Sequence, residues 1–186
     1  MRIVQYGEIP EDPELHRQWN EVAQKMERPE VFYTCEWALA VQGAYRASLK
    51  PLLFLGYEGD ELVGVASLAT NKADENTVFL AASTADYCDF LTQPSSRPDF
   101  LDAVLSALEK SKAASVTLAN LPEDSATTTA LPTAAKKHGF HLHARPAYVC
   151  AQVDLCAGNE RQELKAMLAG RKSSANIFAE WSARVR

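Results

Sequence analysis

Apolar and polar positions follow a helical period in the first part of the chain. Between residues 13 and 26, apolar side chains recur every three or four positions, which is the spacing of one helix face. Asp12 followed by Pro13 is a typical helix start. The same spacing returns after Thr34, which can cap a second helix. Residues 2–6 alternate and predict a short edge strand, so we expect a strand followed by two helices.

The period changes from three or four to two after these helices. Residues 51–57 and 62–68 flank the polar segment 58–61, and this pattern predicts a hairpin. Gly59 would supply the positive φ that a tight turn needs. Residues 77–82 have the composition of a third strand. Three consecutive strands should therefore follow the two helices.

Helix start signals mark the second half of the chain. Ser96 and Asp99 have the spacing of a capping box, and Pro98 suits a first helical turn. They predict a helix over the apolar residues that follow. Residues 115–118 predict a strand, after which comes a second helical stretch that Pro132 should kink or restart.

The C-terminal part predicts two strands and a helix. Gly139 ends the preceding helical stretch, and residues 140–144 and 148–155 have the pattern of two final strands. The segment that begins at Glu160 has a helical pattern, and its apolar residues fall on one stripe. An exposed stripe of this kind should dock on another surface. We therefore expect one domain over residues 1–157 and a C-terminal helix over residues 158–186.

Composition suits one globular domain with a sizeable core. The chain has 186 residues, and 47% of them are hydrophobic. A net charge of -5 makes it a poor candidate for binding nucleic acid or an anionic membrane. No stretch approaches the roughly 18 apolar residues of a membrane-spanning helix, and the acidic N-terminus lacks the apolar core of a secretory signal. We therefore expect a cytoplasmic protein.

Cysteine and histidine positions predict neither disulfides nor a metal site. The four cysteines form no Cys-x-x-Cys pair, so we expect free, mostly buried thiols. His141 and His143 would share one face of a strand, with Cys150 across a hairpin, but no carboxylate stands at a fixed spacing from them. Cys88 lies close to two acids, whose charge raises the pKa of a thiol and makes it a poor nucleophile.

Three hydrogen-bonding side chains interrupt an apolar run after the third predicted strand. Asp86, Tyr87 and Asp89 lie between the apolar residues 78–82 and 90–91. A carboxylate so close to core sequence must be paired, hydrogen-bonded or held at an opening in the fold. In one interpretation the acids cap a turn between two strands. In the other, the three side chains line a cleft and contact a ligand.

Five short motifs lie at residues 34–37, 57–64, 86–91, 118–123 and 170–172. The order of these motifs and of the predicted elements resembles that of the GNAT acyl-CoA N-acyltransferase superfamily. Within it, the chain is similar to the N-terminal half of the CelD/BcsL acetyltransferases, which carry two GNAT-like halves in tandem. The resemblance implies an α/β fold, with a mixed, mostly antiparallel sheet of six to seven strands and helices on both faces.

The resemblance also implies a reaction and roles for particular residues. The reaction is transfer of an acyl group from acetyl-CoA to an amine or hydroxyl of a small molecule or saccharide, in some members linked to exopolysaccharide synthesis. Asp86 or Asp89 would orient the acceptor or accept its proton, and Tyr87 would donate a hydrogen bond or protonate the leaving thiolate. Glu36 and Trp37 would border the substrate cleft, the alternative being an ordinary amphipathic helix.

Two features depart from the family pattern. The family holds the pyrophosphate of CoA in a glycine-containing loop at a helix start. Here residues 95–100 contain no glycine, Pro98 lacks an N–H and Asp99 adds a negative charge, so we expect no CoA binding of the usual kind. In the tandem family a second half with the clearer acyltransferase signature follows the C-terminal helix, so we expect the chain to be a fragment, a truncated product or a stand-alone descendant that lost that half. The alternative function is a non-catalytic module that forms a homodimer or docks a partner through its C-terminal helix.

Overall fold

Alternating side chains of the two longest strands divide the hydrophobic core into two layers. In β2 (Leu49–Glu58), Leu53 and Leu55 pack on one side of the sheet and Phe54 packs on the other. Strand β3 (Glu61–Asn71) has the same alternation. The computed structural model describes residues 1–147, and Met1–Arg145 forms one compact unit.

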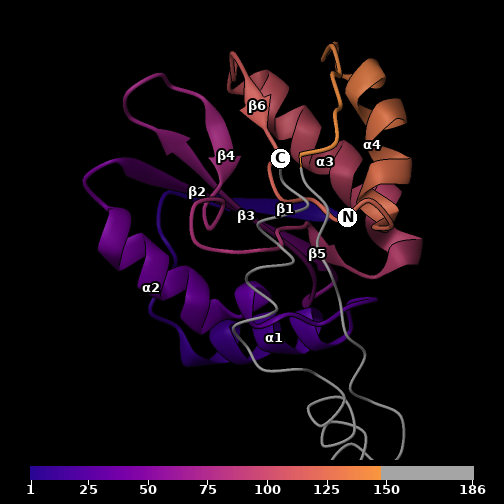
Figure 1. Cartoon of the computed structure of the whole chain (residues 1–186). Coiled ribbons are helices and arrows are strands. Elements are labelled where there is room, and N and C mark those ends of the chain that lie inside the picture. The colour runs from indigo at the N-terminus through magenta and orange to yellow at the C-terminus, as the bar shows by residue number, and fades with distance from the viewer. Residues whose placement is uncertain (148–186) are drawn as a thin grey trace, which may run out of the picture. The chain divides into compact units, whose positions relative to one another are not determined.

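Two pairs of helices cover the two faces of the sheet (Figure 1). Helices α1 (Pro13–Gln24) and α2 (Cys35–Tyr45), with the short 3-10 helix η1 (Val31–Tyr33) between them, pack on one face. Helices α3 (Arg97–Lys110) and α4 (Ala126–Lys137) pack on the other. The predicted helices on both faces are therefore confirmed.

The predicted starts of the first two helices are also confirmed. The side chain of Asp12 accepts a hydrogen bond from the backbone N–H of Glu14 at 2.9 Å, and Pro13 opens α1. The side chain of Thr34 accepts from the N–H of Trp37 at 3.3 Å. These side chains satisfy N–H groups that the first turn of a helix leaves without a partner.

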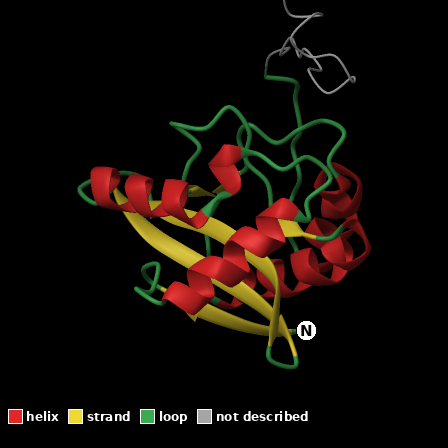
Figure 2. Cartoon of the chain, turned by 90° about the horizontal axis from the view of Figure 1, so that it is seen from below, coloured by secondary structure: helices red, strands yellow, loops and turns green. Residues whose placement is uncertain are grey.

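The strands of residues 1–147 form one sheet (Figure 2), which in this part of the chain has six strands and is mostly antiparallel. Its order is β1-β2-β3-β4-β6, where β1 is Arg2–Tyr6, β4 is Thr77–Phe79 and β6 is Val116–Thr117. Only the β4–β6 pair in this sheet is parallel. Gly59 has a φ of +61° in the β2–β3 turn, as predicted. The mixed, mostly antiparallel fold expected from the sequence is confirmed.

Two short strands share one edge of β3. Strand β4 pairs with residues 68–70 of β3, and β5 (Leu91–Thr92) pairs with Gly64 and Val65 further along the same edge. The prediction of a strand over residues 77–82 was too long, because the N–H of Ala82 bonds the carbonyl of Phe79 in a turn. The chain leaves the edge there and returns at β5, whose two residues are too few to show a period.

A pair of glycines seats α3 on the sheet. Gly56 and Gly64 face each other across the β2–β3 ladder, and the ring of Phe100 packs over both. A Cβ at Gly64 would lie 2.7 Å from the nearest ring carbon of Phe100, and one at Gly56 would lie 2.9 Å away. The missing side chains therefore let the fully buried ring approach the backbone.

Other predictions for residues 94–144 need correction. Ser96 does not cap α3, because its backbone is helical, its side chain accepts no capping bond, and a 3-10 turn, Pro94–Ser96, precedes the helix. Helix α4 continues through Pro132 without restarting. Residues 140–144 are not a strand, because the N–H of Phe140 bonds the carbonyl of Ala135 and closes the helix end.

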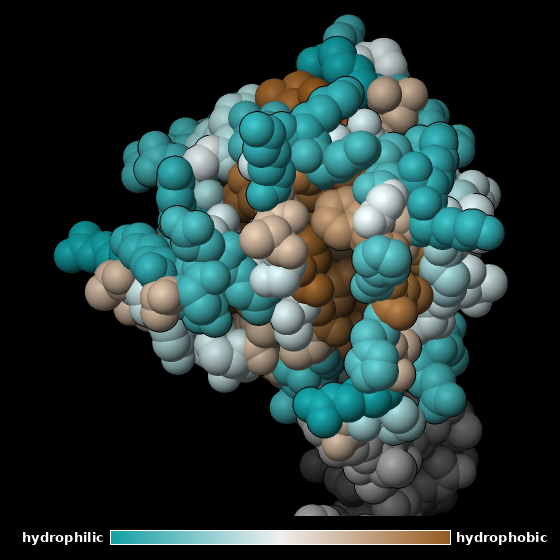
Figure 3. All heavy atoms as spheres, turned by 90° about the horizontal axis from the view of Figure 1, so that it is seen from above, coloured by the Kyte–Doolittle hydropathy of each residue, from teal (hydrophilic) through white to brown (hydrophobic). Residues whose placement is uncertain are grey.

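The remaining predictions fall in the part of the chain that is not described. These are the strand over residues 148–155, the boundary after residue 157 and the C-terminal helix. Within residues 1–147, no helix is long and apolar enough to span a membrane. Figure 3 shows hydrophobic residues gathered in a hollow of an otherwise mostly hydrophilic face. The large hydrophobic side chains that are most exposed are Met1, Tyr6, Val31, Tyr45 and Leu142.

An ionic contact between α3 and α4 makes a pH-dependent contribution to stability. Nε2 of His138 lies 2.9 Å from Asp102 and Nδ1 lies 3.1 Å from Glu109. The pKa of His138 is raised, chiefly by the hydrogen bond to Asp102. Because the folded pKa exceeds the unfolded value of about 6.5, this contribution is complete below that pH and disappears as the pH rises through the folded pKa.

We therefore expect His138→Gln to destabilise the protein at pH 5.5 and to have little effect at pH 9. Urea unfolding of both proteins across this range gives the difference in free energy of unfolding at each pH. His141→Gln is the control, because His141 is exposed. A difference between the wild-type protein and His138→Gln that stays constant with pH would contradict the expectation.

Candidate functional site

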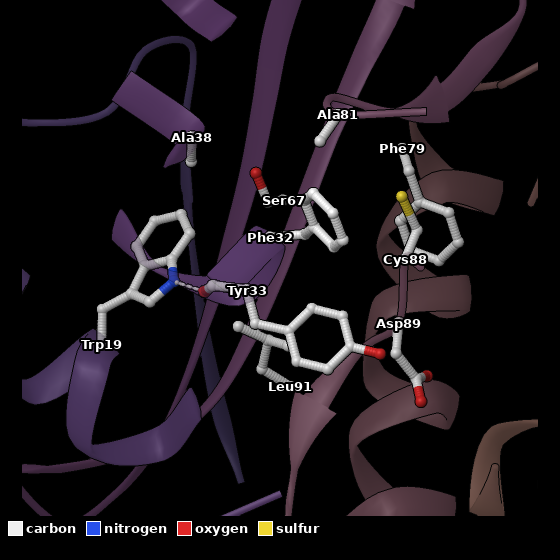
Figure 4. Close-up of a pocket in the computed structure, with 10 residues that line it drawn as sticks. All are labelled: Trp19, Phe32, Tyr33, Ala38, Ser67, Phe79, Ala81, Cys88, Asp89 and Leu91. Carbon is white, nitrogen blue, oxygen red and sulfur yellow. Dashed lines mark hydrogen bonds between the residues drawn. The ribbon is translucent and has the colours of Figure 1, made fainter. Parts of the chain in front are cut away.

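A small cleft opens on the side of the sheet that α1 and α2 cover (Figure 4). Its empty space, including the part open to solvent, is about 330 Å³. The walls come from α1, η1, α2, β3 and β4, and from the segment that leads into β5. The lining residues are Trp19, Phe32, Tyr33, Ala38, Ser67, Phe79, Ala81, Cys88, Asp89 and Leu91.

Tyr33 points its hydroxyl across the cleft toward Asp89 (Figure 4). Its backbone carbonyl accepts a hydrogen bond of 2.8 Å from the indole N–H of Trp19, which holds η1 against α1. The pKa of Tyr33 is raised, first by burial and then by the negative charge of Asp89. The phenol therefore keeps its proton at neutral pH, and its hydroxyl can donate as well as accept a hydrogen bond.

The carboxylate of Asp89 is buried at one end of the cleft and fully hydrogen-bonded. Its oxygens accept from the hydroxyls of Ser125 and Thr127, each at 2.5 Å, and from the backbone N–H of Phe90 at 2.7 Å. The guanidinium of Arg97 donates to both oxygens at 3.2 Å. Burial nevertheless raises the pKa of Asp89, against the lowering effects of Arg97 and these hydrogen bonds.

Arg97 connects four parts of the chain through one guanidinium. Its side chain is 0% exposed and donates to Asp89, to the carboxylate of Glu27 at 3.0 Å and to the carbonyl of Thr92 at 2.7 Å. It also donates to Thr127 at 2.6 Å. The end of α1, the β5 strand and the starts of α3 and α4 therefore meet at a single buried cation, which sequence reasoning missed.

The predicted site residues lie in different environments. Asp89 lines the cleft, whereas Asp86 is exposed and Tyr87 is half-buried against the core layer of α1 and α2. Glu36 is exposed and accepts two hydrogen bonds from the side-chain amide of Asn20, which tie α2 to α1. The structure therefore brings only Asp89 of these four into the cleft.

Trp37, the fifth predicted residue, packs beside the cleft. Its ring meets that of Phe32 edge-on, with centroids 4.9 Å apart, and Phe32 lines the cleft. Its buried indole N–H has no hydrogen-bond partner among residues 1–147. Trp37 therefore supports one wall of the cleft from behind. Roles in catalysis or binding for all five predicted residues stay predictions.

The thiol of Cys88 keeps its proton at neutral pH. Burial, followed by the charge of Asp89, raises the pKa of its thiol to about 12. This confirms the prediction from its neighbouring acids. Within residues 1–147, no group of three or more histidine, cysteine or acidic side chains is placed to hold a metal ion.

The start of α3 does not fit a diphosphate. Such a group is held by free backbone N–H groups at a helix N-terminus. Here the N–H of Ser96 and that of Arg97 already donate to carbonyls of the preceding turn, and Pro98 has no N–H. The guanidinium of Arg97 is buried and bonded, while Asp99 adds a negative charge in the first turn. The residues that would hold CoA in the family pattern are therefore engaged or unsuitable.

Comparisons with known proteins give no family. No protein-family model matches the chain, and no curated protein is found to match it. The chain is similar to a point mutant of TTHA1254 from Thermus thermophilus, with a TM-score of 0.45, 19% identity and coverage of 83% of this chain and 99% of that one.

A second similar structure is apo aminoglycoside antibiotic 6'-N-acetyltransferase AAC(6')-IG from Acinetobacter haemolyticus. The TM-score is 0.43, the identity is 11%, and the match covers 83% of this chain and 100% of that one. Both TM-scores lie below 0.5, so neither similarity decides what this protein does. Residues 1–147 form a mixed α/β domain with a small cleft beside Asp89.

Proposed function

We propose that residues 1–147 form an acyltransferase-like domain that binds the acyl acceptor and does not bind acyl-CoA. The observation that carries this proposal is the start of α3. The N–H groups of Ser96 and Arg97 are already engaged, Pro98 has none, the guanidinium of Arg97 is buried, and Asp99 would repel a diphosphate. The cleft beside Asp89 offers a site for a small molecule.

The order of elements supports the acyltransferase part of the proposal. A strand, two helices, a hairpin, two short strands, a helix, a strand and a helix follow one another, an order that resembles that of the GNAT superfamily. More specifically, we propose that the domain is the N-terminal half of a CelD/BcsL-type tandem protein. Acetyl-CoA would then be held by a second half or a partner, and the acceptor would be a small molecule or saccharide of exopolysaccharide synthesis in the cytoplasm.

Asp86, Tyr87 and Asp89 are the residues that we propose to act on the acceptor. Asp89 is placed for an indirect role, because its carboxylate carries the negative charge beside the cleft while its oxygens stay bonded to the protein. Asp86 is exposed and free to reach a ligand that protrudes from the cleft. Glu36 and Trp37 would flank the acceptor.

The test is a titration of acetyl-CoA into the full 186-residue chain by isothermal calorimetry. We expect no saturable binding, because a diphosphate at α3 would find the N–H groups of Ser96 and Arg97 engaged, no N–H at Pro98, and an unfavourable carboxylate at Asp99. Saturable binding at micromolar acetyl-CoA would contradict the proposal. The same chain should still bind a small acceptor, as described below.

The alternative is a non-catalytic module that docks a partner or a second copy. The same features of α3 favour this module, because they disfavour binding of acyl-CoA while the domain still folds. Light scattering of the full chain separates the two functions. A stable dimer that binds neither acetyl-CoA nor a small molecule would favour the module over the acceptor-binding domain.

A further inference from the structure

We infer that the cleft takes a small uncharged alcohol, with a short apolar body and one hydroxyl. This inference deepens the proposed function, because it names the chemical class of the acceptor. It rests on three features of the cleft: its apolar walls, two hydroxyl groups without partners, and a carboxylate whose bonding capacity is used up.

The walls of the cleft favour an apolar body. Most lining side chains are aromatic or aliphatic, and those of Trp19 and Leu91 are almost fully buried. The empty space of about 330 Å³ includes solvent at the mouth of the cleft, so the enclosed part is smaller than this. It therefore suits a chain of a few carbon atoms, or one end of a larger molecule.

Two hydroxyl groups supply the polar contacts. Tyr33 is only 5% exposed, yet its hydroxyl forms no hydrogen bond within residues 1–147 and points into the cleft (Figure 4). Ser67 contributes a second hydroxyl from β3, likewise without a partner in this part of the chain. An alcohol both donates and accepts a hydrogen bond, so a ligand hydroxyl can pair with the hydroxyl of Tyr33.

The charges around the cleft disfavour an ionic ligand. A carboxylate accepts about four hydrogen bonds, and Asp89 already accepts from Arg97, Ser125, Thr127 and the N–H of Phe90. An ammonium would lose its hydration here without gaining a free carboxylate oxygen. A ligand carboxylate would be repelled by Asp89 and would find no free cation, because the guanidinium of Arg97 is turned to other partners.

Three probes of matched size test the inference: 1-butanol, butylamine and butyrate. Each is titrated into the full 186-residue chain labelled with 15N, and the indole N–H signal of Trp19 reports the cleft. We expect 1-butanol to shift this signal saturably with a millimolar dissociation constant, as suits a ligand of this size. Butylamine and butyrate should bind at least tenfold more weakly.

Two variants locate the binding. Tyr33→Phe removes only the hydroxyl and should weaken 1-butanol binding about fivefold, the usual effect of one neutral hydrogen bond. Tyr45→Phe removes the hydroxyl of a more exposed tyrosine on α2 and should leave the binding unchanged. Equal or tighter binding of butylamine or butyrate, no saturable shift with 1-butanol, or no effect of Tyr33→Phe would overturn the inference.

The outcome of the 1-butanol titration can be distinguished from the outcome of the acetyl-CoA titration. Binding of 1-butanol depends on the cleft, whereas binding of acetyl-CoA depends on the start of α3. Acetyl-CoA binding together with 1-butanol binding would contradict the proposed function and leave the alcohol site standing. A failure of 1-butanol alone would remove the alcohol site and leave the α3 argument unchanged.

Discussion

Replacing Arg97 by methionine should cost about 3–5 kcal/mol of the free energy of unfolding, as for other buried ion pairs that lose one partner. The guanidinium is 0% exposed and the side chain of Asp89 is 4% exposed, so the carboxylate cannot be hydrated in the variant. Glu27 is 34% exposed and can turn to water. The main loss should therefore come from the uncompensated charge of Asp89.

Urea unfolding of the wild-type protein and Arg97→Met measures this loss. Adding Asp89→Asn to Arg97→Met removes the stranded charge, so the double variant should regain part of the stability. Arg17→Met is the control, because Arg17 forms exposed ion pairs on α1 that contribute little. A loss below about 1 kcal/mol for Arg97→Met, or no recovery in the double variant, would refute the role given to Arg97.

Gly64→Ala should destabilise the protein by about 1–3 kcal/mol, the usual cost of overpacking a core. The new methyl group would lie 2.7 Å from the ring of Phe100, which is fully buried. The contact also involves the ring carbon nearest the backbone, at 3.0 Å, so a rotation of the ring cannot relieve it. Helix α3 would have to move away from the sheet.

Thermal and urea unfolding of Gly64→Ala test this expectation. Gly43→Ala is the matched control, because Gly43 lies in α2 with no atom within 4 Å of a new Cβ. That change should stabilise the protein by up to about 1 kcal/mol, since alanine favours a helix over glycine. Adding Phe100→Leu to Gly64→Ala should restore part of the lost stability. A Gly64→Ala protein as stable as the wild type would show that α3 is not held at this contact.

Local signals were sufficient at several helix starts and turns, where the structure depends on neighbouring residues. Asp12, Thr34 and Gly59 were assigned correctly because capping and a tight turn involve groups only a few residues apart. The same reasoning failed at Ser96, whose backbone is already helical because a 3-10 turn precedes α3, so its side chain accepts no capping bond. It also failed at residues 140–144, because an apolar alternation over so few residues does not guarantee a strand partner.

The sequence by itself therefore determined the mostly antiparallel sheet and the order of helices and strands over residues 1–147, apart from β5 and residues 140–144. Only the tertiary structure decided that Asp89 belongs with Arg97 and Ser125, the latter 36 residues away, and that Tyr33 faces the same cleft. The physical reason is that the partner of a buried charge is chosen by how helices pack across the sheet. That packing depends on contacts such as Phe100 on Gly64, and no local spacing in the chain encodes it.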